Sequence, residues 1–211
     1  MKLKALIACE FSGIVRDAFT KAGLDATSCD LLPTESPGKH YQGNVFDIIN
    51  DGWDVLIAFP PCQYLTYAAN SVWFDPGRAQ LRLKALQFFL DLWEAPIDHI
   101  CMENPAGIVH SVIAPYTQII HPYYFGDPEM KRTYLWLKNL PPLTHAPEKT
   151  LFYAKTHTGK PAPVRIQPCG KPVRFVASRN TKSTRAKLRS IFFPSVAKAM
   201  AEQWSYYLQK K

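Results

Sequence analysis

Short, almost continuously apolar runs alternate with stretches of helical periodicity through the first half of the chain. The apolar runs, which we expect to form strands, span residues 3–9, 55–58 and 97–102, and a further short strand is expected over residues 26–29. Between them, apolar side chains recur at helical spacing over residues 15–22 and over residues 78–94. Strands that are apolar on both faces and separated by helices are typical of a parallel sheet covered on both sides. The sequence therefore predicts an α/β fold with a doubly wound, mostly parallel, Rossmann-like sheet.

Two reactive side chains follow expected strands. Cys62 lies in the segment Pro60-Pro61-Cys62-Gln63, directly after the run at 55–58. Glu103 closes the apolar stretch that begins at residue 97. In doubly wound sheets, ligands bind outside the carboxyl ends of the strands, where both side chains are expected. A thiol and a carboxylic acid that meet there suit addition to an electron-poor ring that must be protonated as it is attacked.

Length and composition indicate one well-buried domain. The chain has 211 residues, 47% of them apolar, and no apolar run reaches the roughly 18 residues of a membrane span. We expect no membrane segment, and Glu10 interrupts the first apolar run too early for a signal peptide. The five cysteines are widely spaced and form no Cys-x-x-Cys pair, which favours a reducing cytoplasm over disulfides or structural zinc. The histidines show no metal-ligand spacing, so we expect no metal.

Charge is distributed unevenly along the chain. Residues 1–130 carry 8 Lys and Arg against 15 Asp and Glu, a net charge of −7. Residues 131–211 carry 17 Lys and Arg against 2 Glu, a net charge of +15. Because this second part is also rich in aromatic residues, it is not typical of a solvated tail. A basic, folded surface with aromatic side chains most simply binds a polyanion.

Several segments, in the expected order, resemble the motifs of the cytosine-C5 DNA methyltransferases. The matching segments are Phe11-Ser12-Gly13, Asp30, Gly43-Asn44-Val45, Pro60-Pro61-Cys62-Gln63, 65–67 with 75–78, Glu103-Asn104-Pro105 and 183–201. The resemblance covers most of residues 5–137 and 181–205, and it is closest to a small, phage-type member. It implies a sheet of the S-adenosylmethionine-dependent methyltransferase type. It also implies methyl transfer to C5 of cytosine in DNA.

The resemblance implies roles for individual residues. Cys62 is expected to add covalently to C6 of the cytosine, with Glu103 as the acid that protonates the ring. The cofactor implied is S-adenosylmethionine, and the residues expected to hold it are Phe11, Ser12, Gly13, Asp30, Asn44 and Pro60. Asn44 stands where the family usually has an aspartate, and we expect its amide oxygen to accept from the adenine amino group.

Two features depart from the family pattern. The family usually carries Gln-x-Arg-x-Arg before a strand, and Glu129, Lys131 and Thr133 stand at those three positions here. Arg132 lies between the two arginine positions of the pattern, so strand alternation is expected to point its side chain to the other face of the strand. We therefore expect the positive charge that the family's arginines usually provide to come from Lys131 or from one of three arginines further on: Arg174, Arg179 and Arg185.

The second departure is the size of the segment that follows. We expect a catalytic core over residues 1–137, then a short, basic, Pro-rich arm over 138–180 in place of a target-recognition domain. Residues 181–211 are expected to return to the core with a final helix. The residues expected to contact nucleic acid are Lys131, Arg132, Lys171, Arg174, Arg179 and Arg185.

The expected partner is DNA, as a duplex with a flipped cytosine or as a single strand, because a stacked base cannot reach Cys62. Two alternatives remain open from the sequence. One is the same chemistry on RNA or on a free pyrimidine nucleotide, which the small recognition segment favours. The other is a degenerate methyltransferase that only binds nucleic acid, which the altered Gln-x-Arg-x-Arg segment favours. The oligomeric state is left open.

Overall fold

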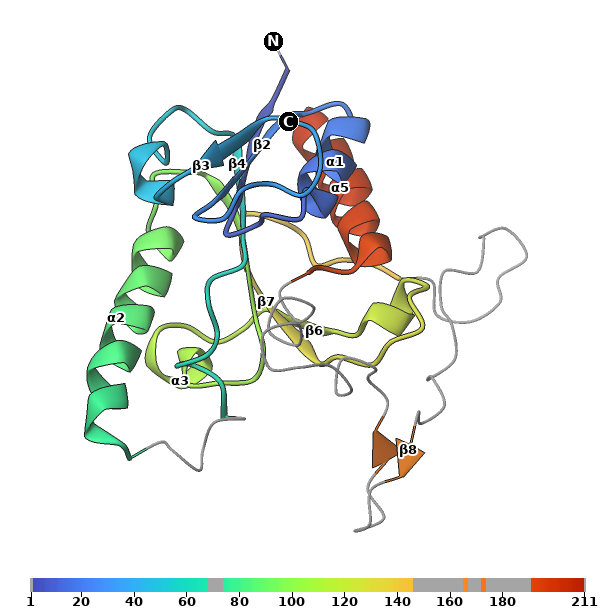
Figure 1. Cartoon of the computed structure of the whole chain (residues 1–211). Helices are drawn as coiled ribbons and strands as arrows, with labels where there is room; N and C mark the ends of the chain where they lie inside the picture. Colours follow the sequence, from blue (N-terminus) through green and yellow to red (C-terminus); the bar gives the residue numbers. More distant parts are fainter. Residues whose placement is uncertain (1, 68–73, 146–164, 167–171, 174–190, 211) are drawn as a thin grey trace.

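The computed structural model describes residues 2–67, 74–145, 165–166, 172–173 and 191–210. Its centre is a seven-stranded sheet in the order β3-β2-β1-β4-β5-β7-β6 (Figure 1). The strands are β1 (Lys4–Ala8), β2 (Asp25–Asp30), β3 (His40–Gln42), β4 (Val55–Ala58), β5 (His99–Asn104), β6 (Gln118–Ile120) and β7 (Thr133–Lys138). β7 runs antiparallel to both of its neighbours, and the other pairings are parallel. The predicted α/β fold with a doubly wound, mostly parallel sheet is confirmed.

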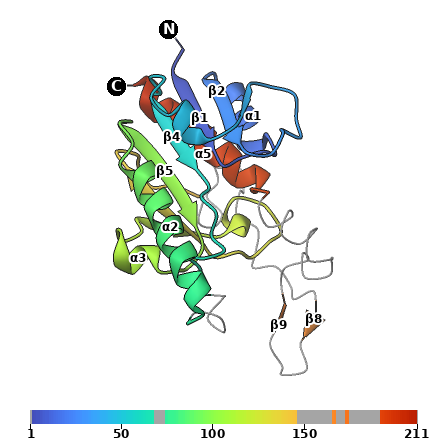
Figure 2. The same cartoon turned by 60° about the vertical axis from the view of Figure 1, so that its left-hand side comes forward.

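Helices cover both faces of this sheet. α1 (Ile14–Lys21) and α5 (Pro194–Gln209) lie side by side on one face, and α2 (Pro76–Trp93) lies on the other (Figures 1 and 2). The remaining helical elements are short: η1 (Val45–Asp47), α3 (Val109–Val112) and η3 (Pro122–Tyr124). A separate two-stranded ladder pairs β8 (Arg165–Ile166) with β9 (Pro172–Val173). No helix in the described part of the chain is long and apolar enough to cross a membrane.

The central strands are apolar on both faces because each face meets a helical layer. In β4, Ile57 packs in the cluster under α1 and α5, whereas Leu56 packs in the cluster under α2. Both side chains are 0% exposed. Alternate residues of a strand point to opposite faces, so a buried parallel strand needs an unbroken apolar run. This requirement explains why the pattern located β4 correctly.

Several elements differ from the sequence prediction. β3 lies in a stretch for which the sequence pattern predicted no strand, because its residues are polar and pair only with the end of β2. α2 begins at Pro76 rather than near residue 78, since Asp75 caps it by accepting a hydrogen bond from Gly77 N at 2.9 Å. β5 extends through Glu103 to Asn104, because both residues pair with β7.

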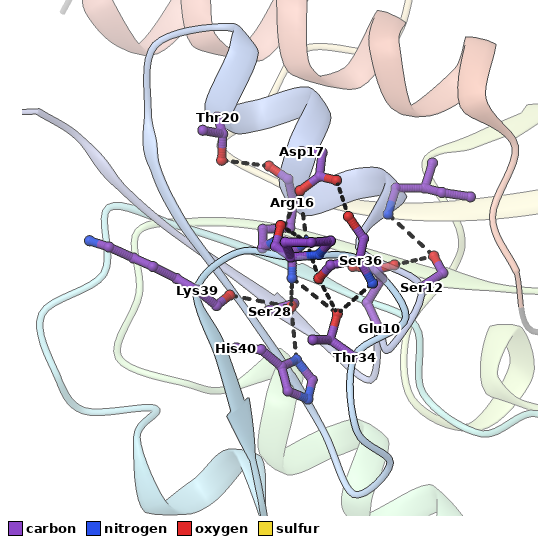
Figure 3. A network of polar contacts seen from close by, with 12 residues as sticks. Glu10, Ser12, Arg16, Asp17, Thr20, Ser28, Thr34, Ser36, Lys39 and His40 are labelled. Carbon is purple, nitrogen blue, oxygen red and sulfur yellow. Dashed lines mark hydrogen bonds and ion pairs between the residues drawn. The ribbon is translucent and has the colours of Figure 1, made fainter.

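A buried arginine attaches the loop between β2 and β3 to α1 (Figure 3). Arg16 is 1% exposed. Its Nη1 donates to Ser28 Oγ at 3.2 Å and to Thr34 Oγ1 at 3.1 Å, and its Nη2 donates to the carbonyl of Ser36 at 3.0 Å. Ser28 Oγ also lies 2.9 Å from Nδ1 of His40, so the network reaches β3. The guanidinium thus attaches α1 to the buried Ser28 of β2 and to the loop that follows it.

We predict that Arg16→Met lowers the free energy of unfolding by about 3 kcal/mol, because a buried charged donor is lost and its acceptors stay behind. Urea denaturation of the variant and the wild type measures this difference. Lys21→Met, an exposed position on the same helix, should change stability by less than about 0.5 kcal/mol. Equal effects of the two substitutions would show that the network contributes little to stability.

Candidate active site

The chain leaves the sheet after β4 in a turn that carries Cys62. Pro60 and Pro61 lack backbone N–H groups, so the strand cannot continue its ladder through them. The carbonyl of Cys62 then accepts hydrogen bonds from Leu65 N and Thr66 N, both at 3.0 Å. Leu65 is 0% exposed and anchors the turn, whereas Cys62 itself is only half-buried. The thiol therefore lies at the edge of the protein on a fixed turn.

The end of β5 holds this turn from the side. Ala58 pairs with Met102, so the residues that follow the two strands run next to each other. Asn104, which is 1% exposed, donates from Nδ2 to the carbonyl of Pro60 at 2.8 Å. These contacts bring the turn with Cys62 beside the strand end that carries Glu103.

A second set of contacts closes the far side of the turn. Ile108 N donates to the carbonyl of Leu65 at 2.9 Å, and Thr66 Oγ1 donates to the carbonyl of Ala106 at 3.3 Å. At Gly107 a Cβ atom would lie 2.1 Å from that same Leu65 carbonyl, so only glycine allows the two segments to approach this closely.

Glu103 forms an ion pair with Lys131. Lys131 Nζ lies 3.5 Å from Glu103 Oε1, and the two side chains are 28% and 9% exposed. The same ammonium lies 5.6 Å from the centre of the Phe193 ring, just before α5. Lys131, one of the candidate cations named from the sequence, thus lies at Glu103. Arg132 is exposed and lies over the Tyr134 ring instead, at 5.6 Å.

The remaining predicted nucleic-acid contacts are Lys171, Arg174, Arg179 and Arg185, and all four lie outside the described residues. The same holds for most of the expected basic arm over 138–180.

The segment that carries Lys131 is attached to the N-terminus of α5. Asp127 Oδ2 accepts a hydrogen bond from Ser195 N at 3.1 Å. Glu129, which stands at the glutamine position of the family pattern, accepts on its backbone carbonyl from Tyr123 N at 3.1 Å. Burial raises the pKa of both carboxyl groups, and the charge of Asp127 raises that of Glu129 further.

A cavity of about 310 Å³ opens at the carboxyl ends of β1 and β2. Its lining residues are Cys9, Cys29, Asp30, Leu31, Gly43, Asn44, Val45, Pro61 and Phe88. Two predicted cofactor residues, Asp30 and Asn44, belong to this lining. Pro60 is buried beside the lining residue Pro61. Ligand sites of this kind are mostly apolar with a few polar groups, and this cavity has that character.

The polar groups of the cavity are partly engaged already. Asp30 Oδ1 accepts from Leu32 N at 2.9 Å, and within the described chain its other carboxylate oxygen has no hydrogen-bond partner. Asn44 Oδ1 accepts from Phe46 N at 3.2 Å and so caps η1. One Asp30 oxygen is therefore open to a ligand hydroxyl, whereas the Asn44 oxygen has one lone pair left.

The predicted residues Phe11, Ser12 and Gly13 do not line this cavity. Gly13 has φ 80° at the start of α1, and a Cβ there would lie 2.6 Å from Arg16 Nη2. Its glycine is thus explained by backbone conformation and by packing of Arg16. Ser12 Oγ donates to the carboxyl group of Glu10, whose pKa is raised by burial. Phe11 is buried.

Sequence reasoning missed several lining residues of the cavity. Phe88 comes from α2 and was read only as part of the apolar pattern, whereas Val45, from η1, was named only within the Gly43-Asn44-Val45 segment and not as a site residue. Cys9 has φ 58°, which is unusual for a non-glycine residue. No local signal in the sequence marks Phe88 or Cys9 as a cavity residue.

The thiols of the cavity are poor nucleophiles. Burial, and then the neighbouring Asp30 charge, raises the pKa of Cys29 to about 11, and the same causes raise the pKa of Cys9 even further. Cys101 is 0% exposed, and burial also raises its pKa. Among the described cysteines, Cys62 is therefore the one placed for reaction.

We predict that iodoacetamide at about pH 8 modifies Cys62 first and leaves Cys29 unmodified. With a pKa of about 11, only about one Cys29 thiol in a thousand is ionised at that pH. Raising the pH toward 11 increases the thiolate fraction, so modification of Cys29 should rise with it. Peptide mass spectrometry measures both sites. Equal labelling of Cys29 and Cys62 at pH 8 would contradict the assignment.

No protein-family model and no curated protein sequence matches the chain. Among solved structures, it is similar to an E. coli prophage protein proposed to be a DNA modification methyltransferase (18% identity, TM-score 0.41, 64% of this chain and 46% of that chain). It is also similar to a DNMT2 mutant from Spodoptera frugiperda (20%, 0.41, 77% and 58%) and to the Entamoeba histolytica methyltransferase EhMeth (16%, 0.45, 77% and 58%). The chain thus spans about half the length of these proteins. Similarity at this level leaves the function to be argued from the site itself.

Among the described residues, no group of three or more His, Cys, Asp or Glu side chains is arranged to hold a metal ion.

Proposed function

We propose that this protein transfers a methyl group from S-adenosylmethionine to C5 of cytosine in DNA, through a covalent adduct with Cys62. The observation that carries the proposal is the hydrogen bond from Asn104 to the carbonyl of Pro60. It joins the turn of Cys62, the best-placed thiol among the described cysteines, to the strand end that bears Glu103. A nucleophile and an acid are thereby brought to one edge of the sheet.

The chemistry assigned to these residues is nucleophilic activation of an unreactive ring. Cytosine C5 becomes nucleophilic only after an addition at C6. The thiolate of Cys62 forms a bond to C6, and the electron pair of the C5–C6 double bond moves toward N3. Glu103 shares a proton with N3 and so neutralises the charge that develops there. After the transfer, loss of the C5 proton and cleavage of the S–C6 bond restore the ring and free the thiol.

Lys131 supports this role of Glu103. Its ammonium, 3.5 Å from the carboxyl group, holds that side chain at the end of β5. A lysine carries three donors on a compact charge, so it can contact Glu103 and the pyrimidine oxygen together. The altered Gln-x-Arg-x-Arg segment is therefore compatible with a working site, and this favours an enzyme over a degenerate binding protein.

The cavity at β1 and β2 fits an adenosine-like group. Vicinal ribose hydroxyls suit the open carboxylate oxygen of Asp30, and the apolar lining of Leu31, Val45 and Phe88 suits a flat base. When it is bound, S-adenosylmethionine supplies an electrophilic methyl group for the activated C5. Pro61 lines the cavity and directly precedes Cys62, so one turn contacts the proposed cofactor site and also carries the proposed nucleophile.

DNA is the proposed substrate because residues 131–211 carry a net charge of +15 and include aromatic side chains. The base must leave the stack to meet a thiol on a turn of the protein surface, so the target is flipped out of a duplex or lies in a single strand. RNA and a free pyrimidine nucleotide are the alternatives that the short recognition segment leaves, and the substrate test below separates them.

We predict that the wild type forms a denaturation-resistant adduct with DNA that contains 5-fluorocytosine, in the presence of S-adenosylmethionine. Fluorine at C5 cannot leave as a proton does, so the S–C6 bond persists. Cys62→Ala should abolish the adduct, whereas Cys101→Ala, which removes a buried thiol outside the cavity, should still form it. Denaturing gel electrophoresis with labelled DNA shows the result.

An adduct that survives Cys62→Ala would remove Cys62 from the mechanism. Transfer of a labelled methyl group to DNA, RNA and free nucleotide, compared in one assay, identifies the substrate. Turnover of the free nucleotide alone would overturn the assignment of DNA, and transfer to none of the three would favour the degenerate binding protein.

We also predict that Asp30→Ala weakens binding of S-adenosylmethionine by about 1–3 kcal/mol, because ligand hydroxyls are left without an acceptor. Isothermal titration calorimetry measures the change. Asp47→Ala, an exposed carboxylate in the adjacent η1, is the matched control and should bind as the wild type does. Unchanged affinity of Asp30→Ala would take this residue out of the cofactor site.

A further inference from the structure

The N-terminal half of α2 makes few contacts with the sheet. The buried residues of this helix are Phe89 and Leu92, both in its C-terminal half. Toward the other end, Leu83 is 61% exposed and Phe74, just before the helix, is 93% exposed. Figures 1 and 2 show this end of α2 extending away from the sheet. A helix end with so little apolar packing needs another attachment.

Arg78 provides such an attachment, and it does so on the turn that carries Cys62. Its Nη2 donates to the carbonyl of Gln63, the residue after Cys62, at 3.1 Å. Its guanidinium also lies over the ring of Tyr64, with Cζ 4.9 Å from the ring centre. Arg78 is half-buried although its neighbours along the first turns of α2 are exposed. A planar guanidinium can hydrogen-bond and stack at once, which a lysine cannot.

The turn around Cys62 is thus held by Arg78 in addition to Asn104 and the segment around Gly107. Asn104 fixes its beginning, through the carbonyl of Pro60, and Arg78 fixes the stretch just after the thiol, through the carbonyl of Gln63. Glu103 and Lys131 also carry charge at this end of the sheet, and they pair with each other. The start of α2 directs Arg78 to the turn because the Asp75 cap and Pro76 set where the first helical turn begins.

We infer that Arg78 is a positioning residue that holds the Cys62 turn in the geometry needed for attack on the base. This inference rests on the proposed nucleophilic role of Cys62. Arg78 touches neither the thiol nor the proposed cofactor cavity; it acts through the backbone of Gln63 and the ring of Tyr64. A turn released on this side would place the thiol less accurately, and a displacement of about 1 Å is enough to cost about a hundredfold in rate.

The test combines amide hydrogen exchange with steady-state kinetics on the full-length protein. In Arg78→Met, the Leu65 and Thr66 amides, which bond to the carbonyl of Cys62, should exchange about tenfold faster than in the wild type. The Phe59 amide, which bonds to the carbonyl of Ala8 in β1, should exchange as before and serves as internal reference. With DNA as substrate, kcat should fall about a hundredfold while the KM for S-adenosylmethionine stays the same.

Two further variants sharpen the result. Arg78→Lys keeps the charge and loses the planar fork, so it should restore only part of the protection and of kcat. Lys84→Met removes an exposed charge from the same helix and should leave both quantities unchanged. Faster exchange at Phe59 as well would indicate a general loss of stability in Arg78→Met. The exchange at Leu65 and Thr66 relative to Phe59 is then measured in Arg78→Lys, the milder change, and decides whether Arg78 holds the turn.

Unchanged exchange at Leu65 and Thr66 in Arg78→Met would overturn the inference, as would a rise in the cofactor KM with an unchanged kcat. If the proposed function is wrong, no variant and no wild type turns over, yet the exchange experiment still decides whether Arg78 holds the turn.

Discussion

The hydrogen bond between Asn104 Nδ2 and the carbonyl of Pro60 connects the two strand ends on which the whole site depends. Two prolines force the chain out of the sheet after β4, and the carbonyl they leave behind is buried and must find a donor. Asn104 supplies that donor from β5, because the parallel register brings the two strand ends level. The contact between the Pro-Pro turn and the Glu-Asn strand end thus has a structural reason that does not depend on the proposed chemistry.

The sequence predicted those parts of the fold where local pattern and tertiary environment agree. β4 and α1 were found because a doubly buried strand must be uniformly apolar and an amphipathic helix must repeat its apolar face. β3 was missed because its polar residues form a strand only through partners on β2, among them the contact between Ser28 and His40. The reach of β5 to Asn104 was missed for the same reason, since antiparallel β7 completes the pairing there.

In the candidate site too, some residues could be proposed from the sequence and others could not. Cys62, Glu103 and Asp30 could be proposed from the sequence because reactive residues after strands stand out, and the topology places strand ends together. The cavity residues Phe88 and Cys9 gave no such signal, because one is an ordinary core residue in sequence and the other acquires its place through an unusual backbone conformation. The sequence left the choice between Lys131 and distant arginines open. The structure places Lys131 at Glu103, on a loop that contacts α5, and the three arginines lie outside the described residues, so the choice stays open.

The site is therefore supported by elements from both faces of the sheet. Ser195, at the start of α5, donates to Asp127 and so attaches the segment that carries Lys131. Phe193, just before α5, lies under the Lys131 ammonium. α2, on the opposite face, reaches the Cys62 turn through Arg78. Between these supports, β4 and β5 supply the rigid strand ends. Under the proposed function, attack on a ring carbon tolerates little misplacement, and these supports would fix a thiol on a turn, whereas a thiol within a strand would be fixed but could not meet a base.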